Sequence, residues 1–222
     1  MKNQARQSGF TLVEIAIVLV IIGLLLGGIL KGQEMITQAR IKNVTNDFNG
    51  TTAAYFSYQD RYKAVPGDDG GAATRWASFG AFNGNSDGSI VGLYMAPAKD
   101  PTTMANGNTD ESLKFWWHLR MAGFIPGPTA GAGAATQPNN AVGGIIGVQA
   151  GGLGLTGLVV CSSNIPDKIA SAVDTQLDDQ RSKAGSMRAY TQTAPNEDIS
   201  GKASAADYVE DGATQYIICK TV

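Results

Sequence analysis

The residue types that most often perform chemistry are scarce in this chain. It contains one histidine, His118, and two cysteines, Cys161 and Cys219. These three side chains are too few for a four-coordinate zinc site, and a single histidine leaves little for histidine-based catalysis. Phosphate-binding loops, dinucleotide fingerprints and nucleic-acid modules are not recognisable in the sequence. The chain is therefore not expected to be an enzyme.

One turn-rich segment imitates two functional motifs. Residues 84–88 match the G-x-S-x-G pattern of serine nucleophiles, but that pattern needs a strand before it and a helix after it. The spacing of Asn83, Asn85 and Asp87 imitates the start of a calcium-binding EF-hand loop, but the twelfth position is Tyr94 instead of glutamate. We favour a plain Asn/Gly turn, with Asn83, Asn85 and Asp87 as calcium candidates and no other cofactor.

The third chemical feature is an acid inside an apolar run. Phe10–Leu30 is a 21-residue apolar stretch with a single charge, Glu14. At about 1.5 Å per residue it covers about 30 Å, the thickness of a bilayer's hydrocarbon core. The apolar core of a signal peptide is usually about 7–15 residues and ends at a small-residue cleavage site, whereas this run continues into Lys31-Gly32-Gln33-Glu34. We therefore predict a membrane span, with Lys2 and Arg6 on its cytoplasmic side and the bulk of the chain outside.

Glu14 needs an explanation within such a span. A carboxylate at mid-bilayer costs roughly 2.5–3.5 kcal/mol and marks a functional site by default. No basic side chain lies within one helical turn of Glu14, although an amine at Phe10 would, if the chain were cut after Gly9. We expect the carboxylate to lack a partner in its own chain and to obtain one from another chain. The structural alternative is a plain anchor with a stray acid.

The start of the run resembles a known processing signal. Gly9-Phe10-Thr11-Leu12-Val13-Glu14, followed by the apolar run, is similar to the class III signal of type IV prepilins and pseudopilins. The resemblance implies that a membrane prepilin peptidase cuts between Gly9 and Phe10 and methylates the new amine of Phe10. It also implies that Glu14 pairs with the amine of a neighbouring subunit during filament assembly.

A second half of the same helix should follow the span. Apolar and aromatic residues recur at spacings of three and four, which predicts one buried stripe on a helix that ends before Val65-Pro66. The stripe consists of Ile41, Val44, Phe48, Thr51, Tyr55, Tyr58 and Tyr62. We expect the stripe to pack on the head of its own chain, which is the pilin-like architecture that the resemblance implies. The expected organisation is a leader (1–9), a membrane and filament-core helix (10–30), an amphipathic stem (31–64) and a head (65–222).

The head is expected to be α+β, with extra helices on an antiparallel sheet of about four strands. We predict a short helix near Ala72–Ser78. Asn108 or Thr109 should cap an aromatic helix that ends at Gly123, with Glu111 completing a capping box. His118 lies in that helix and should be structural. The other predicted elements are a flexible loop leading into a strand within residues 126–154, strands at 155–161, 186–190 and 215–219, and a helix opened by Ile165-Pro166-Asp167.

The two cysteines close a loop across the second half of the head. Because the head is expected to face an oxidising compartment, a Cys161–Cys219 disulfide is favoured; two buried free thiols are the alternative. The pairing is similar to the C-terminal disulfide that bounds a variable loop in many pilins. The resemblance then implies that residues 162–218, within the disulfide-bounded region 161–219, form the corresponding exposed region.

The resemblance implies a structural subunit of a type IV pilus-like filament, with roles in adhesion, motility or DNA uptake. The alternative is a pseudopilin of a type II secretion system. The expected partners are other copies of the chain, the prepilin peptidase, and an inner-membrane assembly platform with its ATPase. Nucleic acid is not expected as a specific ligand, because the net charge is −2. The precursor would sit in a bacterial inner membrane with its head in the periplasm, and the product would be a surface filament or a periplasmic pseudopilus.

Overall fold

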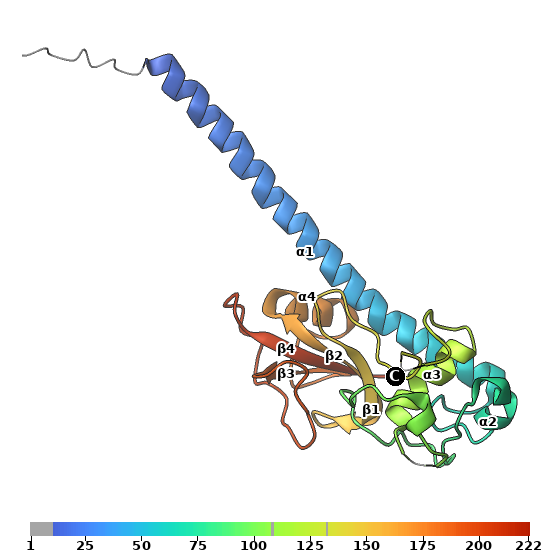
Figure 1. The fold of residues 1–222 in the computed structure, drawn as a ribbon. Helices are drawn as coiled ribbons and strands as arrows, with labels where there is room; N and C mark the ends of the chain where they lie inside the picture. Colours follow the sequence, from blue (N-terminus) through green and yellow to red (C-terminus); the bar gives the residue numbers. More distant parts are fainter. Residues whose placement is uncertain (1–10, 108, 132) are drawn as a thin grey trace, which may run out of the picture. The chain divides into compact units, whose positions relative to one another are not determined.

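The structure is a computed structural model that describes residues 11–107, 109–131 and 133–222. Its contacts divide the chain into two units, residues 1–39 and 40–222, and each is described by itself. The helix α1 (Leu12–Tyr62) runs through both units. Figure 1 shows the elements of the second unit, here called the head: α1 from residue 40 onward, three further α-helices and four strands.

The first unit is the N-terminal half of α1. Its side chains from Leu12 to Leu30 are exposed over all faces of the helix. Within the described residues, α1 is the helix that is long and apolar enough to cross a membrane. Its glycines, Gly23, Gly27 and Gly28, have no atoms within 4 Å of the place where a side chain would begin. This half of α1 therefore offers its whole apolar surface to lipid or to another protein.

The part of α1 in the head carries the predicted stripe. Ile41, Val44, Phe48, Thr51 and Tyr58 are buried as the spacing indicated, and Tyr55 and Tyr62 are partly buried against the same core. Ala54 is buried as well, although the pattern did not include it. These residues form one hydrophobic cluster with side chains of α3, α4 and the sheet.

The sheet has four strands in the order β1-β2-β4-β3, and every pair is antiparallel. The strands are β1 (Ile146–Gly152), β2 (Leu155–Pro166), β3 (Met187–Gln192) and β4 (Gln215–Thr221). The prediction of an α+β head with about four antiparallel strands is confirmed. One face of the sheet contributes Val148, Val160 and Ile218 to the cluster that includes α1.

The opposite face of the sheet is covered by loops. Tyr94, Leu153 and Ile199 pack there on Val159 and Ile217 of the strands. The two cysteines lie on this face as well, because side chains alternate along each strand. Cys161 of β2 is directly opposite Cys219 of β4, and their sulfurs form a disulfide.

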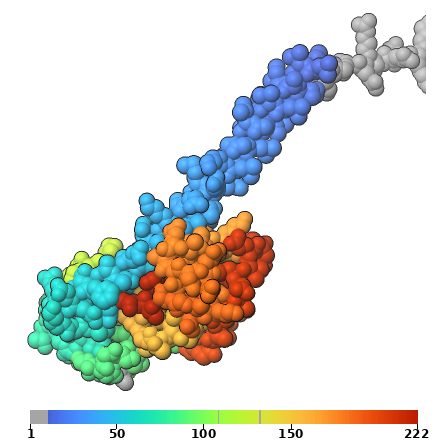
Figure 2. Space-filling model, turned by 180° about the vertical axis from the view of Figure 1, so that it is seen from behind, coloured from blue at the N-terminus to red at the C-terminus, as the bar shows by residue number. Residues whose placement is uncertain are grey.

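Two α-helices flank the sheet and α1. The first, α3 (Glu111–Met121), buries Trp116, Trp117 and His118, and the second, α4 (Asp167–Leu177), begins directly after Pro166 as predicted. Thr45 on α1 donates a hydrogen bond to Gln176 on α4 (3.1 Å), and Figure 2 shows these two helices side by side on the surface. Short helices α2 (Ala72–Arg75), η1 (Ala77–Phe79) and η2 (Pro101–Thr103) lie in the preceding loops.

The predicted capping box of α3 is wrong. Glu111 is the first helical residue, preceded by Asp110, whose side chain makes no capping hydrogen bond; Asn108 lies outside the described residues. The Glu111 carboxylate instead accepts hydrogen bonds from the backbone N–H groups of Asn85 and Val91. Glu111 therefore makes tertiary hydrogen bonds with the loop that contains Asn85 and Val91, in place of the local capping hydrogen bond that the sequence suggested.

Candidate functional site

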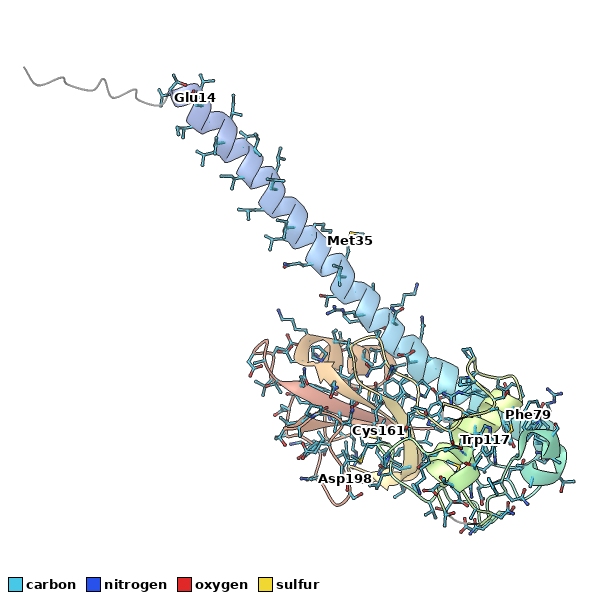
Figure 3. All side chains as sticks on the ribbon, viewed as in Figure 1. Glu14, Met35, Phe79, Trp117, Cys161 and Asp198 are labelled. Atoms are coloured by element: carbon cyan, nitrogen blue, oxygen red, sulfur yellow. A yellow bond between two sulfur atoms is a disulfide. The ribbon has the colours of Figure 1, made fainter. Side chains whose placement is uncertain are left out.

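Glu14 lies in the first turn of α1 (Figure 3). Its Oε2 accepts hydrogen bonds from the backbone N–H and from the hydroxyl of Thr11, both at 2.8 Å. The Glu14 N–H in turn donates to Thr11 Oγ1 at 3.3 Å. This reciprocal pattern is a capping box, in which two otherwise unpaired N–H groups of a helix start find acceptors.

The expectation that Glu14 lacks a partner in its own chain is therefore wrong. The sequence argument counted charged groups only, whereas a threonine three residues earlier and the free N–H groups of a helix start also satisfy a carboxylate. Both partners are neutral, so no charged group within residues 11–107, 109–131 and 133–222 compensates the charge of Glu14. Gly9 and Phe10, the predicted cleavage and methylation residues, lie outside the described residues.

The turn cluster at residues 83–88 wraps around the buried carboxylate of Asp68. The backbone N–H groups of Ser86, Asp87 and Gly88 all donate to Asp68, at 2.5, 3.3 and 2.7 Å. A side chain at Gly84 would begin 2.2 Å from the Asp68 backbone, so only glycine fits this close approach. Gly84 and Gly88 therefore allow this segment to fold closely around Asp68.

The arrangement around Ser86 is not that of a nucleophile. Its Oγ accepts a hydrogen bond from the Gly70 N–H. His118 lies elsewhere: its Nδ1 accepts from the Gly67 N–H and its Nε2 contacts the Phe82 carbonyl, each at 3.0 Å. The structure thus pairs the chain's one histidine with backbone groups.

The calcium candidates are already engaged with protein groups. Asn83 Oδ1 accepts from the Ala73 N–H (2.7 Å), and Asn85 donates its amide to Asp87 Oδ2 (2.7 Å). The other oxygen of Asp87 accepts from the Ser89 N–H (2.9 Å). Asn85 and Asp87 are brought together, while the side-chain oxygen of Asn83 accepts its hydrogen bond from helix α2. A cation at this turn stays a prediction from the sequence pattern.

A second carboxylate network joins the end of α1 to α2 and to the loop before α2. Tyr58 donates its hydroxyl to Asp69 Oδ2 at 2.6 Å, and the Arg75 guanidinium donates to the same oxygen at 2.5 Å. Burial opposes ionisation of Asp69, but the hydrogen bonds from Tyr58 and Arg75 outweigh it and lower the pKa of Asp69. The Arg75 guanidinium also lies 4.2 Å from the centre of the Tyr62 ring. This network is structural, because it fixes the end of α1.

Three acids near the end of α4 place oxygen atoms within 4.8 Å of one another: Asp174, Asp178 and Asp179. Asp174 accepts from the Tyr208 hydroxyl and the Gln180 N–H, and Asp178 accepts from the Met187 N–H. These hydrogen bonds hold the segment between α4 and β3 and account for the cluster.

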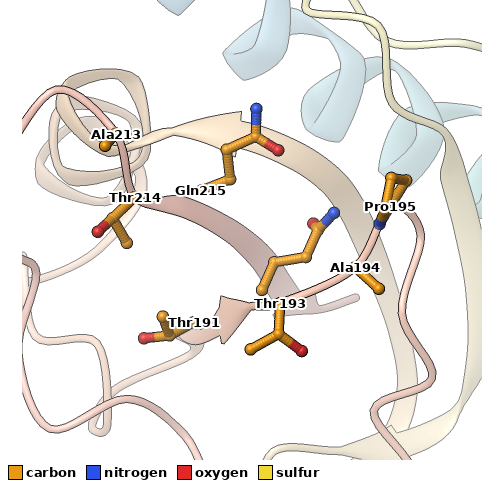
Figure 4. Close-up of a pocket in the computed structure, with 8 residues that line it drawn as sticks. Thr191, Thr193, Ala194, Pro195, Ala213, Thr214 and Gln215 are labelled. Atoms are coloured by element: carbon orange, nitrogen blue, oxygen red, sulfur yellow. The ribbon is translucent and has the colours of Figure 1, made fainter.

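A pocket of about 200 Å³ lies between the end of β3 and the start of β4 (Figure 4). Its lining is formed by Thr191, Gln192, Thr193, Ala194, Pro195, Ala213, Thr214 and Gln215. All of these side chains are neutral and none titrates in the physiological range. The pocket therefore offers hydrogen bonds but no acid, base or nucleophile of catalytic type.

Comparisons with known proteins bear on the N-terminal segment. Residues 4–30 match the prokaryotic N-terminal methylation motif. No curated protein matches the chain. Among solved structures, the major type IV pilin PilA1 from Clostridium difficile is similar, with 11% sequence identity, a TM-score of 0.37, and coverage of 82% of this chain and 96% of that one.

The matched motif covers the start of α1, where the apolar residues are exposed and Glu14 is the single acid in the apolar run. The rest of the chain supplies the α1 stripe, the antiparallel sheet and the disulfide described above. The comparisons therefore identify the start of this chain, residues 4–30, as a prokaryotic N-terminal methylation motif.

Proposed function

We propose that this chain is a structural subunit of a type IV pilus-like filament and polymerises through its N-terminal helix. The observation that carries the proposal is the exposed apolar surface of α1 from Leu12 to Leu30, in which Glu14 is the single charge. Burying apolar surface contributes roughly 25 cal/mol per Å², so such a helix requires lipid or other helices around it. Lipid would cover it in the precursor, and the helices of neighbouring subunits would cover it in the filament.

Processing would supply the missing charge. A prepilin peptidase would cut between Gly9 and Phe10 and methylate the amine of Phe10. That amine is a cation, whereas Thr11 offers Glu14 only neutral donors. Exchanging Thr11 for the amine of a neighbouring subunit would neutralise a carboxylate in an apolar environment, which is where charge pairing matters most.

The proposed cellular location rests on the apolar N-terminal half of α1 and on the disulfide of the head. The precursor would lie in the inner membrane with its head in the periplasm, where the Cys161–Cys219 disulfide persists. Extraction into the filament would use an assembly platform and its ATPase. Residues 162–218, between the two cysteines, would form the region exposed on the filament, with adhesion, motility or DNA uptake as roles.

A pseudopilin of a type II secretion system is the alternative. Such a subunit would use the same cleavage, the same pairing of Glu14 and a shorter filament confined to the periplasm. The two functions differ in where the filament ends. Electron microscopy of sheared cell surfaces separates them, since only a pilus leaves long filaments made of this chain outside the cell.

Glu14→Ala tests the assembly mechanism. We expect the variant to insert and to be cut, because neither step requires the charge pair, but to give no filaments or a yield lower by at least about tenfold, since the loss of one desolvated ion pair changes affinity by that order. Mass spectrometry of the membrane fraction should find a methylated Phe10 N-terminus in the wild type and in the variant.

Two results would contradict the proposal. An intact Met1 in the mature wild-type protein would exclude processing after Gly9. Normal filament yield from Glu14→Ala would exclude the pairing mechanism even if processing occurs. Glu34→Ala serves as the matched control, because Glu34 is an exposed acid on the same helix that already pairs with Lys31 (2.7 Å).

A further inference from the structure

A groove of about 240 Å³ lies on the head between α1 and the loops next to α3 and β1. One side is the face of α1 that carries Asp47 and Gly50. The other side is apolar and includes Ile125, Pro138 and Ile146, with Trp116 also in the lining. All of these residues belong to the unit formed by residues 40–222.

Two polar groups in this groove have no partner among the described residues. The Asp47 carboxylate is half-buried and takes part in no hydrogen bond or ion pair there; burial raises its pKa to about 6. Trp116 is 1% exposed, and its indole N–H is buried without an acceptor. Buried groups without partners are costly. By contrast, two of the buried carboxylates of the head, Asp68 and Glu111, are hydrogen-bonded to backbone N–H groups.

The chemistry of the groove defines what would fill it. A half-buried carboxylate calls for a cation, and the apolar wall suits the alkyl stem of a long basic side chain. The volume of about 240 Å³ is below the roughly 300–1,000 Å³ of small-molecule sites. It matches a single side chain better than a whole ligand, so the occupant is a basic residue of a protein.

We propose that this groove binds a basic side chain of a second copy of the chain, with its cation on the Asp47 carboxylate. The inference rests on the proposed filament, because it places the groove on the same helix that carries the assembly segment. The chain can supply the cation: Lys168, Arg181 and Lys183 are exposed and form no ion pair among the described residues. Asp47 is thus a second assembly residue, distinct from Glu14.

Asp47→Asn separates this role from a merely structural one. The amide keeps the shape but removes the charge, so we expect the filament yield to fall at least about tenfold, as for the loss of a buried interfacial charge pair. The detergent-solubilised subunit should have an unchanged or higher melting temperature at pH 7.5, because an unpaired half-buried charge has been removed. Asp60→Asn is the control, since Asp60 is an exposed acid on the same helix that pairs with Lys63.

Gly50→Leu tests the groove without touching a charge. No atom lies within 4 Å of the point where a side chain at Gly50 would begin, and replacing a helical glycine stabilises a helix. The leucine should therefore raise the melting temperature while filling the groove and lowering the filament yield. Ser57→Leu, which adds the same bulk at an exposed position of α1 outside the groove, should assemble like the wild type.

The outcomes distinguish this inference from the function on which it rests. Absence of wild-type filaments would overturn both. Wild-type filaments together with normal yields from Asp47→Asn and Gly50→Leu would overturn the groove and leave the filament proposal intact. If the two variants assemble normally and lose only their association with another envelope protein, the occupant is not a second copy and the proposal is overturned. A parallel drop in melting temperature and yield would assign Asp47 a structural role and would also overturn it.

Discussion

The buried ionisable side chains of the head are stabilised mainly by backbone groups. Asp68 is 3% exposed and accepts three backbone N–H groups, and Glu111 is fully buried and accepts two. His118 is also fully buried, between the Gly67 N–H and the Phe82 carbonyl. Such groups are costly to bury unless they are paired, so these contacts fix the loops of the head around them.

His118 provides a direct test at this scale. Burial lowers its pKa from 6.5 to about 4, so the imidazole stays neutral in the folded protein at pH 5. The unfolded chain binds a proton between pH 6.5 and 4, and stability is therefore lost as the pH falls through that window, by on the order of 3 kcal/mol from this residue. Because the chain has one histidine, its NMR signals are unambiguous, and they should not titrate between pH 5 and 8. A midpoint near 6.5 would show that the ring is accessible.

At the scale of elements, α1 is the part on which the other elements pack. Its apolar stripe joins α3, α4 and the sheet in a single core. Near its end, α1 is also held by directional hydrogen bonds, because the Tyr58 hydroxyl and Arg75 both donate to the Asp69 carboxylate. If a subunit in a filament were pulled along α1, the force would act on these hydrogen bonds between α1, Asp69 and Arg75.

We expect Tyr58→Phe to lower the free energy of unfolding by about 1.5–3 kcal/mol, the usual contribution of a hydrogen bond to a charged group. The ring stays in the core, but Asp69 loses one of its donors inside the protein. Urea unfolding followed by tryptophan fluorescence measures the change. Tyr62→Phe is the control, since the Tyr62 hydroxyl makes no hydrogen bond in the described part of the chain. Equal stability of the two variants would mean that the Tyr58 hydroxyl contributes nothing.

At the scale of the whole chain, the two units make different demands on their surroundings. The first needs an apolar environment for its exposed helix. The second has its own core and a disulfide between β2 and β4 with a sequence separation of 58 residues. The disulfide ties the stability of the head to an oxidising compartment, which agrees with the proposed periplasmic location.

The paired change Cys161→Ser and Cys219→Ser should lower the free energy of unfolding by up to about 4 kcal/mol, since the bridge restricts the unfolded chain. A reductant should destabilise the wild type by the same amount and leave the double variant unchanged. Urea titrations of both proteins with and without dithiothreitol check this. A reductant effect on the double variant, or none on the wild type, would contradict the prediction.

Much of the fold and of the N-terminal site followed from the sequence. The heptad-like spacing from Ile41 to Tyr62 indicated the buried stripe, and the β-branched run before Cys161 indicated β2, because such patterns reflect local geometry. The partner of Glu14 was missed although Thr11 is only three residues away, since charged groups alone were considered. The role of Glu111 was assigned to a local capping box, whereas a loop twenty or more residues away in the sequence accounts for it.

The sequence by itself determined that this chain has a prepilin-type signal, an apolar helix with one acid, and an α+β head with two cysteines. Those features depend on short-range patterns, namely the spacing of residues within one helix, one strand or one processing motif. Only the tertiary structure decided that residues 83–88 enclose Asp68, that Cys161 lies opposite Cys219, and that Asp47 and Trp116 share a groove. These are contacts between segments far apart in the chain, and no local pattern specifies which backbone N–H will meet which carboxylate once the core has packed.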